Sequence, residues 1–170
     1  MSIETVKDYL KAWGKDAAVV EFAVSCATVE LAAEAVGVEP ARIAKTLAFK
    51  SGTTSLEKGV MDCIMVVAAG DARIDGTKFK RRFGVKSKML SPEEAFSLTG
   101  HAVGGVCPFA VTNPAAVVYL DISLQRFTTI FPACGSSNSV MELACDELFA
   151  IALAREWVDV CKGWEGERHG

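Results

Sequence analysis

The sequence predicts a mixed α/β (α+β) fold, in which a mixed, barrel-like β-sheet is flanked by helices. Strand-like and helix-like hydrophobic periods are interspersed along the chain. They do not follow the regular β-α-β order that a doubly wound parallel sheet requires. A chain of 170 residues with 51% hydrophobic residues can also fill one core. We therefore expect a single domain over residues 1–170, with its core at about residues 17–153.

The first half of the chain is predicted to contain two helices and three strands. Apolar residues at helical spacing favour a helix over residues 6–13, which Gly14 ends. Thr28 is a favourable N-cap for a second helix that reaches Val36 and stops at Gly37. Strands are expected at residues 17–24, 43–49 and 63–68.

The rest of the chain, from residue 76 onward, is predicted to contain three helices and four strands. A basic helix is expected at residues 76–83, and Ser91-Pro92-Glu93-Glu94 is typical of the start of another, which ends near Gly100. A last helix is expected at residues 146–158. Strands are expected at residues 85–90, 117–121, 127–131 and 140–143.

Charge and hydropathy exclude several classes of protein. The net charge is -3, which argues against binding of DNA or RNA by bulk electrostatics. No apolar run approaches the ~18 residues that span a bilayer. The N-terminus lacks the basic and apolar stretches of a secretory signal, so we expect a cytoplasmic protein without a membrane partner.

The basic residues are concentrated in one short segment. Six positive charges and no acidic residue occur between Lys78 and Lys88, while the other 12 basic residues face 21 acidic ones. Such a run either keeps a helix face soluble or contacts phosphates. The six residues are Lys78, Lys80, Arg81, Arg82, Lys86 and Lys88.

The six cysteines show neither a disulfide framework nor a metal site. They lie far apart and form no C-x-x-C pair, and the chain has two histidines, so neither a metal nor a cofactor is expected. Most have apolar neighbours, which is typical of reduced, buried thiols. They are Cys26, Cys63, Cys107, Cys134, Cys145 and Cys161.

Common catalytic motifs are missing, and two weaker features remain. The chain has no G-x-S-x-G, G-x-x-x-x-G-K-[ST], G-x-G-x-x-G or H-E-x-x-H motif. Lys45 shares one face of the expected strand at residues 43–49 with apolar side chains, so its ammonium either binds an anionic ligand, pairs with an internal acid or reaches solvent. The loop Gly104-Gly105-Val106-Cys107-Pro108 permits close approach of its backbone to a ligand. His101 and Cys107 are the one candidate pair for nucleophilic catalysis.

Together these segments resemble the YbaK/prolyl-tRNA editing domain family of aminoacyl-tRNA deacylases. The resemblance rests on the Lys45 segment and the G-x-x-x-P loop in this order, together with Leu90-Ser91-Pro92-Glu93-Glu94, Thr99-Gly100-His101, Tyr119-Leu120-Asp121 and Ala133-Cys134-Gly135-Ser136. It covers roughly residues 17–153. It implies the aminoacyl-tRNA synthetase-associated fold and hydrolysis of the ester that joins a wrong amino acid to tRNA, with Cys- or Ala-tRNA(Pro) as the expected substrate.

The resemblance also implies roles for individual residues. The catalytic set would be Lys45, Gly104, Gly105, Val106, Cys107 and Pro108, acting on a water molecule with help from the substrate's ribose hydroxyl and without a protein nucleophile. Thr46, His101, Gly135, Ser136 and Ser137 would bind substrate. Lys78, Lys80, Arg81 and Arg82 would contact tRNA.

Two other functions remain open from the sequence. A non-catalytic module could hold an aminoacyl end or a synthetase, with prolyl-tRNA synthetase as the candidate partner. Alternatively, Cys107 and His101 could form a cysteine-dependent hydrolase. A non-catalytic module would not need both Lys45 and the loop, whereas a cysteine-dependent hydrolase would need an accessible thiol of low pKa.

Overall fold

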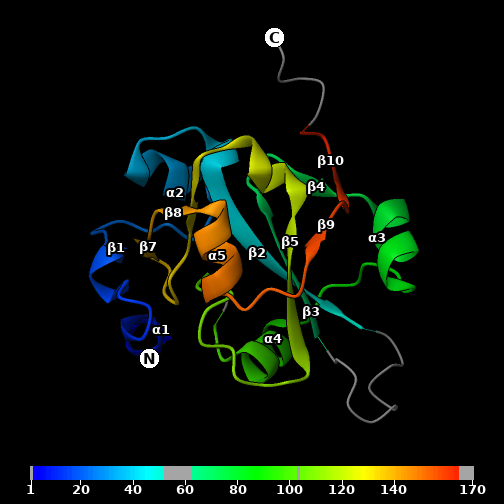
Figure 1. Ribbon diagram of the computed structural model, residues 1–170, viewed down its shortest axis with the longest axis horizontal. Coiled ribbons are helices and arrows are strands. Elements are labelled where there is room, and N and C mark those ends of the chain that lie inside the picture. Colours follow the sequence, from blue (N-terminus) through cyan, green and yellow to red (C-terminus); the bar gives the residue numbers. More distant parts are fainter. Residues whose placement is uncertain (1, 52–62, 103, 165–170) are drawn as a thin grey trace.

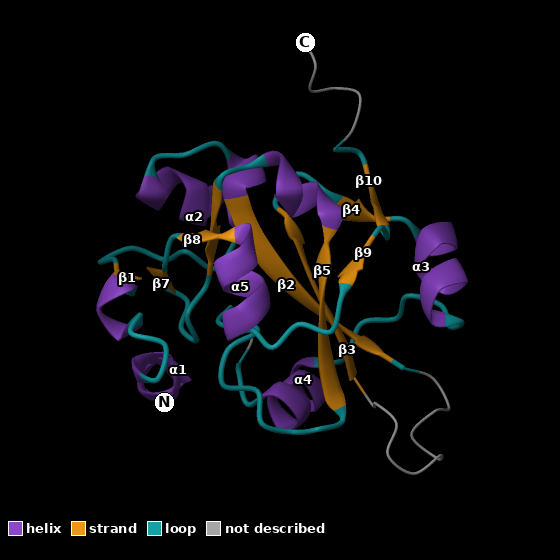
Figure 2. Ribbon diagram, viewed as in Figure 1, coloured by secondary structure: helices purple, strands orange, loops and turns teal. Residues whose placement is uncertain are grey.

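The fold is a mixed α/β arrangement around a six-stranded sheet, as the sequence predicts (Figures 1 and 2). It is seen in a computed structural model that describes residues 2–51, 63–102 and 104–164. The strand order is β8-β6-β2-β3-β5-β9, and the sheet curls into a half-barrel. Its strands are β2 (Ile43–Lys50), β3 (Cys63–Ala69), β5 (Ala116–Asp121), β6 (Thr129–Pro132), β8 (Leu143–Ala144) and β9 (Trp157–Val158).

The sheet combines both kinds of strand pairing. β2 pairs antiparallel with β3 over seven positions, in a register that sets Lys45 opposite Ala68. β3 is parallel to β5, and β5 is parallel to β9. β6 runs parallel to β2 and antiparallel to β8. Two short ribbons lie outside the sheet: β1 (Val20–Glu21) with β7 (Ser139–Val140), and β4 (Arg73–Ile74) with β10 (Cys161–Lys162).

Five described helices surround the sheet, and local capping signals set the ends of several. Thr28 accepts a hydrogen bond from the Leu31 amide at the start of α2, and Gly37 ends that helix with a φ of 85°. Ser91 and Glu94 form a capping box at the start of α4. The helices are α1 (Ser2–Lys11), α2 (Val29–Val36), α3 (Gly76–Phe83), α4 (Pro92–Thr99) and α5 (Cys145–Ile151).

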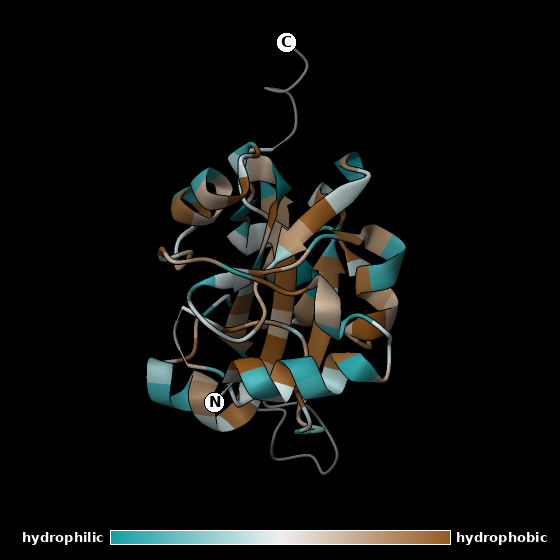
Figure 3. Cartoon of the chain, turned by 90° about the vertical axis from the view of Figure 1, so that its left-hand side faces the viewer, coloured by the Kyte–Doolittle hydropathy of each residue, from teal (hydrophilic) through white to brown (hydrophobic). Residues whose placement is uncertain are grey.

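The core lies against the central strands. All seven residues of β3 are buried, and the strands are mostly hydrophobic in Figure 3. A row of aromatic rings packs α3 against the sheet. The ring centroid of Phe79 lies 4.8 Å from those of both Phe49 and Phe83, and the ring centroid of Phe83 lies 4.9 Å from that of Tyr119. None of the described helices has the length and apolar composition that crossing a membrane requires.

Two predicted strands are largely wrong. The strand expected at residues 17–24 is a 3₁₀ turn at Asp16–Ala18 followed by the two-residue β1, because its partner β7 is equally short. The segment at residues 85–90 forms no strand but a single bridge, in which Met89 faces Phe49. This bridge covers the part of the β2 edge that β6 leaves free.

The C-terminal prediction also needs correction. The last helix ends at Ile151 rather than near residue 158. Leu153 adopts a φ of 52°, and the Arg155 amide then donates to the Val118 carbonyl, so the chain joins the sheet as β9. The strand expected at residues 140–143 is divided between β7 and β8.

Candidate active site

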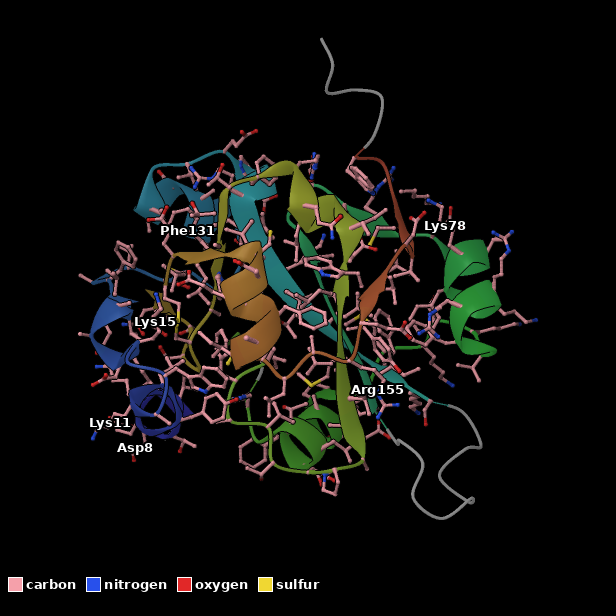
Figure 4. The ribbon with its side chains drawn as sticks, in the orientation of Figure 1. Asp8, Lys11, Lys15, Lys78, Phe131 and Arg155 are labelled. Atoms are coloured by element: carbon pink, nitrogen blue, oxygen red, sulfur yellow. The ribbon has the colours of Figure 1, made fainter. Side chains whose placement is uncertain are left out.

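A cavity of about 360 Å³ lies between β2, α2, α4 and the start of the loop at residues 104–108. Its lining combines small side chains with a few large apolar ones, among them Phe131, which is labelled in Figure 4 beside α2. We call this cavity the pocket. Its alanine and glycine lining residues are Ala27, Ala32, Ala44, Ala48, Ala95, Gly104 and Ala133.

Lys45 is the one charged side chain in the described lining of the pocket. Its Nζ donates to the carbonyl oxygen of Gly70, at 3.3 Å, and to that of Ala72. Burial lowers the pKa of this ammonium, and the negative charges of Asp71 and Glu30 oppose that change. Because an ammonium has three N–H donors, one remains for a ligand.

The loop contributes Gly104 and Val106 to the same pocket. The amide of Gly105 donates to the carbonyl of Ala102 at 3.0 Å. The Val106 amide has no acceptor within the described residues. The structure therefore brings Lys45 and the loop residues Gly104 and Val106 to the same pocket.

Gly135, Ser136 and Ser137 support the loop and do not line the pocket. A Cβ on Gly105 would lie 2.8 Å from the carbonyl of Gly135 and 2.9 Å from the amide nitrogen of Ser136. A Cβ on Gly104 would lie 3.4 Å from the Cβ of Ser137. Their predicted role as substrate-binding residues therefore has no direct geometric basis here.

The side chains of His101 and Cys107 are buried and do not line the pocket. His101 is 1% exposed and Cys107 is fully buried, with 3.6 Å between Nε2 and Sγ. Burial raises the pKa of the Cys107 thiol to about 12 and lowers that of His101. This geometry argues against Cys107 as a nucleophile and against direct substrate contact by His101. Pro108 also faces away, toward a separate cavity that Tyr9 lines.

Several pocket residues were missed by the sequence reasoning. Cys26 and Thr28 enter the lining from the segment before α2, and Met89 and Leu90 enter from the segment before α4. Thr28 was identified as a helix cap, and Leu90 only as part of the family resemblance. Nothing local marks Cys26 or Met89, because their placement depends on how α2 and α4 pack against β2. Thr46, a predicted site residue, does line the pocket.

The basic segment divides into paired and unpaired charges. Lys78, labelled in Figure 4 near α3 and β10, bonds to Asp159 at 3.1 Å and to the Cys161 carbonyl at 3.0 Å. Arg82 pairs with Glu156 and lies over the Phe83 and Tyr119 rings. A second, open cavity of about 680 Å³, which we call the basic hollow, is lined by four cations: Lys80, Arg81, Lys86 and Lys162.

Two segments of backbone connect the basic hollow to the pocket. Residues 70–75 run from the carbonyls that hold Lys45 to Asp75, a carboxylate that lines the hollow beside the cations. Lys86 lines the hollow, and Met89, three residues later, lines the pocket. Arg73 lies directly opposite Lys162 in the β4–β10 ribbon. Like charges facing each other in this way repel, which a bound anion would relieve.

The described residues contain no group of three or more His, Cys, Asp or Glu side chains that could hold a metal ion. All six cysteines are free thiols, and five of them are buried.

Comparisons with known proteins identify the class to which this fold and pocket belong. Residues 23–151 match the family model of the aminoacyl-tRNA editing domain, and the chain belongs to that family. The protein is thus a hydrolase of ester bonds, of the aminoacyl-tRNA deacylase class.

Relatives of known sequence or structure extend over most of the chain. It is 47% identical to "Uncharacterized protein YwhH" of Bacillus subtilis over 97% of this chain and 100% of that protein. It is 25% identical to "Putative Cys-tRNA(Pro)/Cys-tRNA(Cys) deacylase EbsC" of Enterococcus faecalis, over 85% of this chain and 79% of that one. A crystal structure described as "a putative trans-editing enzyme for prolyl tRNA synthetase" superposes with a TM-score of 0.81 and 30% identity, covering 95% and 98% of the two chains.

Proposed function

We propose that this protein is a trans-editing deacylase that hydrolyses the ester of mischarged tRNA(Pro). The observation that carries the proposal is the meeting of Lys45 and the G-x-x-x-P loop at one pocket of about 360 Å³. The family assignment supports the reaction class. Since aminoacyl-tRNA is made and used in the cytoplasm, we propose that the enzyme acts there, without a metal or cofactor.

The chemistry we propose depends on the substrate's own groups. The described lining of the pocket contains hydroxyl and thiol side chains but no His, Asp or Glu that could serve as their base. A water molecule would attack the ester carbonyl, with the terminal ribose hydroxyl of the tRNA handling the proton. The amide of Val106 would donate to the developing oxyanion. The free N–H of Lys45 would bind the terminal phosphate or that same developing charge.

The pocket favours an uncharged amino acid side chain. Its lining is mostly apolar, and no described carboxylate is present to neutralise a cationic side chain. Alanine and cysteine are the amino acids a proline site cannot strongly exclude, since a methylene is worth only ~1–3 kcal/mol of discrimination. The names of two relatives, which refer to Cys-tRNA(Pro) and to prolyl-tRNA synthetase, support this choice of substrate and partner.

We propose that the basic hollow and the neighbouring ribbon bind the phosphate backbone of the acceptor stem. Lys80 and Arg81 keep the role expected from the sequence, because no described carboxylate pairs with them. Lys78 and Arg82 contribute less, since each is held by a carboxylate and by further contacts. Arg73 and Lys162, which the sequence reasoning did not select, join the surface.

The proposal is tested by the release of amino acid from alanyl-, cysteinyl- and prolyl-tRNA(Pro), with the Lys45→Ala variant as control. We expect rapid loss of one mischarged species, slow loss of the prolyl ester and no activity in the variant. A Cys107→Ser variant should keep its rate. Binding without hydrolysis of any ester would instead indicate a non-catalytic module.

A further inference from the structure

The side chain of His101 connects the two ends of the loop that borders the pocket. Its Nε2 lies 2.8 Å from the carbonyl oxygen of Phe109, eight residues along the chain. Its own amide donates to Thr99 Oγ1 at 3.1 Å, and that hydroxyl donates to the Ala95 carbonyl of α4. His101 therefore joins the end of α4 to the far side of the loop, and Ala95 itself lines the pocket.

The hydrogen bond defines the state of the imidazole. A carbonyl oxygen can only accept, so Nε2 must carry the proton that is donated to Phe109. Nδ1 is buried and has no hydrogen-bond partner within the described residues. The Sγ of Cys107 lies 3.6 Å from the same Nε2. The neutral ring therefore has one N–H donor, which binds the loop carbonyl, and it has no donor left for a ligand.

The loop needs such a support because of its backbone conformation. Gly104 has a φ of 92°, and Ala110, directly after Phe109, has a φ of 60° that an alanine adopts only at a cost. Between these two positions lies Val106, whose amide faces no described acceptor. If the Phe109 carbonyl were released, the strained backbone at Ala110 could relax, and Val106 would move with it.

We propose that His101 is a positioning residue that holds the Val106 amide at the pocket through its hydrogen bond to Phe109. The inference builds on the proposed deacylase function, but the loop contact can be tested without any substrate. His101 touches no ligand in this scheme, which replaces its expected role in substrate binding.

Two polar variants separate the hydrogen bond from the loss of the ring. In His101→Gln, the side-chain amide nitrogen can reach about the position of Nε2, so the bond to Phe109 is restored. In His101→Asn, the side chain ends about one bond earlier, and the carbonyl stays unpaired. Both variants replace a buried ring by a primary amide, so we expect them to lower the stability of the fold by comparable amounts.

The first readout is alkylation of Cys107 by iodoacetamide, followed at each cysteine by mass spectrometry. A fully buried thiol reacts only when its surroundings open. Cys63 and Cys161, also fully buried, report global unfolding in the same sample. We expect about tenfold faster alkylation of Cys107 in His101→Asn, with unchanged rates at the two reference thiols and near wild-type behaviour in His101→Gln.

The second readout is steady-state deacylation. We expect kcat to fall about tenfold in His101→Asn with KM for tRNA unchanged, and His101→Gln to recover most of kcat. Equal acceleration at all three cysteines, or equal loss in both variants, would show a merely structural role and overturn the proposal. If the wild-type protein hydrolyses no ester, the proposed function fails, while the alkylation result still decides whether His101 holds the loop.

Discussion

Gly105 and Gly135 meet backbone to backbone, so closely that a Cβ on Gly105 would lie 2.8 Å from both the carbonyl carbon and the carbonyl oxygen of Gly135. Backbone atoms cannot rotate away as the end of a side chain can. The loop at residues 104–108 therefore rests on the segment that follows β6, and its position depends on the lack of a side chain at Gly105.

A Gly105→Ala substitution should displace the loop and lower the deacylation rate at least tenfold. The melting temperature should fall by several degrees, because a shift of ~1–3 kcal/mol is typical of overpacking. Gly76→Ala is the matched control, since nothing lies within 4 Å of a Cβ there and the position is helical. That variant should melt at the wild-type temperature or above. Equal effects of the two changes on melting would contradict the contact.

Replacing Lys45 by methionine should remove at least about 99% of the activity and preserve the fold. Methionine keeps the length of the side chain but offers no N–H to a phosphate or an oxyanion. Lys50→Met is a control on the same strand, where the lysine is half exposed and pairs loosely with Glu94 at 3.6 Å. We expect the Lys50 variant to turn over at nearly the wild-type rate. Circular dichroism spectra and single-turnover rates of the two variants check this prediction.

The Val106 amide can be removed by Val106→Pro and compared with Val106→Ala. Loss of one preorganised donor to an oxyanion typically lowers kcat by about 10²–10³. The alanine variant keeps the N–H and should lose less than tenfold. If the proline variant is folded and equally active, the oxyanion must be stabilised by another group.

The two halves of the basic segment should differ in their effect on tRNA binding. Lys80→Ala with Arg81→Ala should weaken binding and make it less dependent on salt, since about one counterion is released per phosphate contact. Lys78→Ala with Arg82→Ala should change the salt dependence little and lower stability instead, because these cations hold Asp159 and Glu156. Filter binding at several salt concentrations distinguishes them. If the binding constants of both double variants depended on salt concentration with the same slope, the distinction between paired and unpaired cations would be refuted.

The stability of the protein should fall in mild acid, partly through His101. Burial lowers the pKa of this imidazole below its usual value of 6.5, so the folded protein binds the proton less readily than the unfolded chain. Its contribution to the free energy of unfolding is then complete above about pH 6.5 and is lost as the pH falls through the folded pKa. The neighbouring thiols of Cys107 and Cys134, whose pKa values are raised, stay neutral in this range.

Urea denaturation at pH 7.5, 6.5 and 5.5 measures this dependence. The wild-type protein should lose up to about 1.4 kcal/mol per pH unit at this site once the pH is below 6.5. His101→Gln, which has no titrating ring, should lose correspondingly less. Parallel curves for the two proteins would exclude His101 as the titrating group.

Elements whose signals lie within a few residues were predicted well. α2 and α4 begin at the expected caps, Thr28 and Ser91, because a cap is a hydrogen bond between neighbours in sequence. α3 occupies the predicted residues Gly76–Phe83. The last helix was predicted too long because its helical pattern competes with hydrogen bonds from β5, about 35 residues away, which the pattern cannot contain.

The sequence by itself determined the mixed α/β class, the main strands and the two segments, around Lys45 and Gly104, that mark the family. Only the tertiary structure decided that these segments meet at one pocket, and that the side chains of His101 and Cys107 are buried outside it. It also decided which cations on α3 are already paired. The physical reason is the range of the interactions: caps and periodicity act within one or two turns, whereas burial, ion pairing and close backbone contact depend on residues that folding brings together from distant positions.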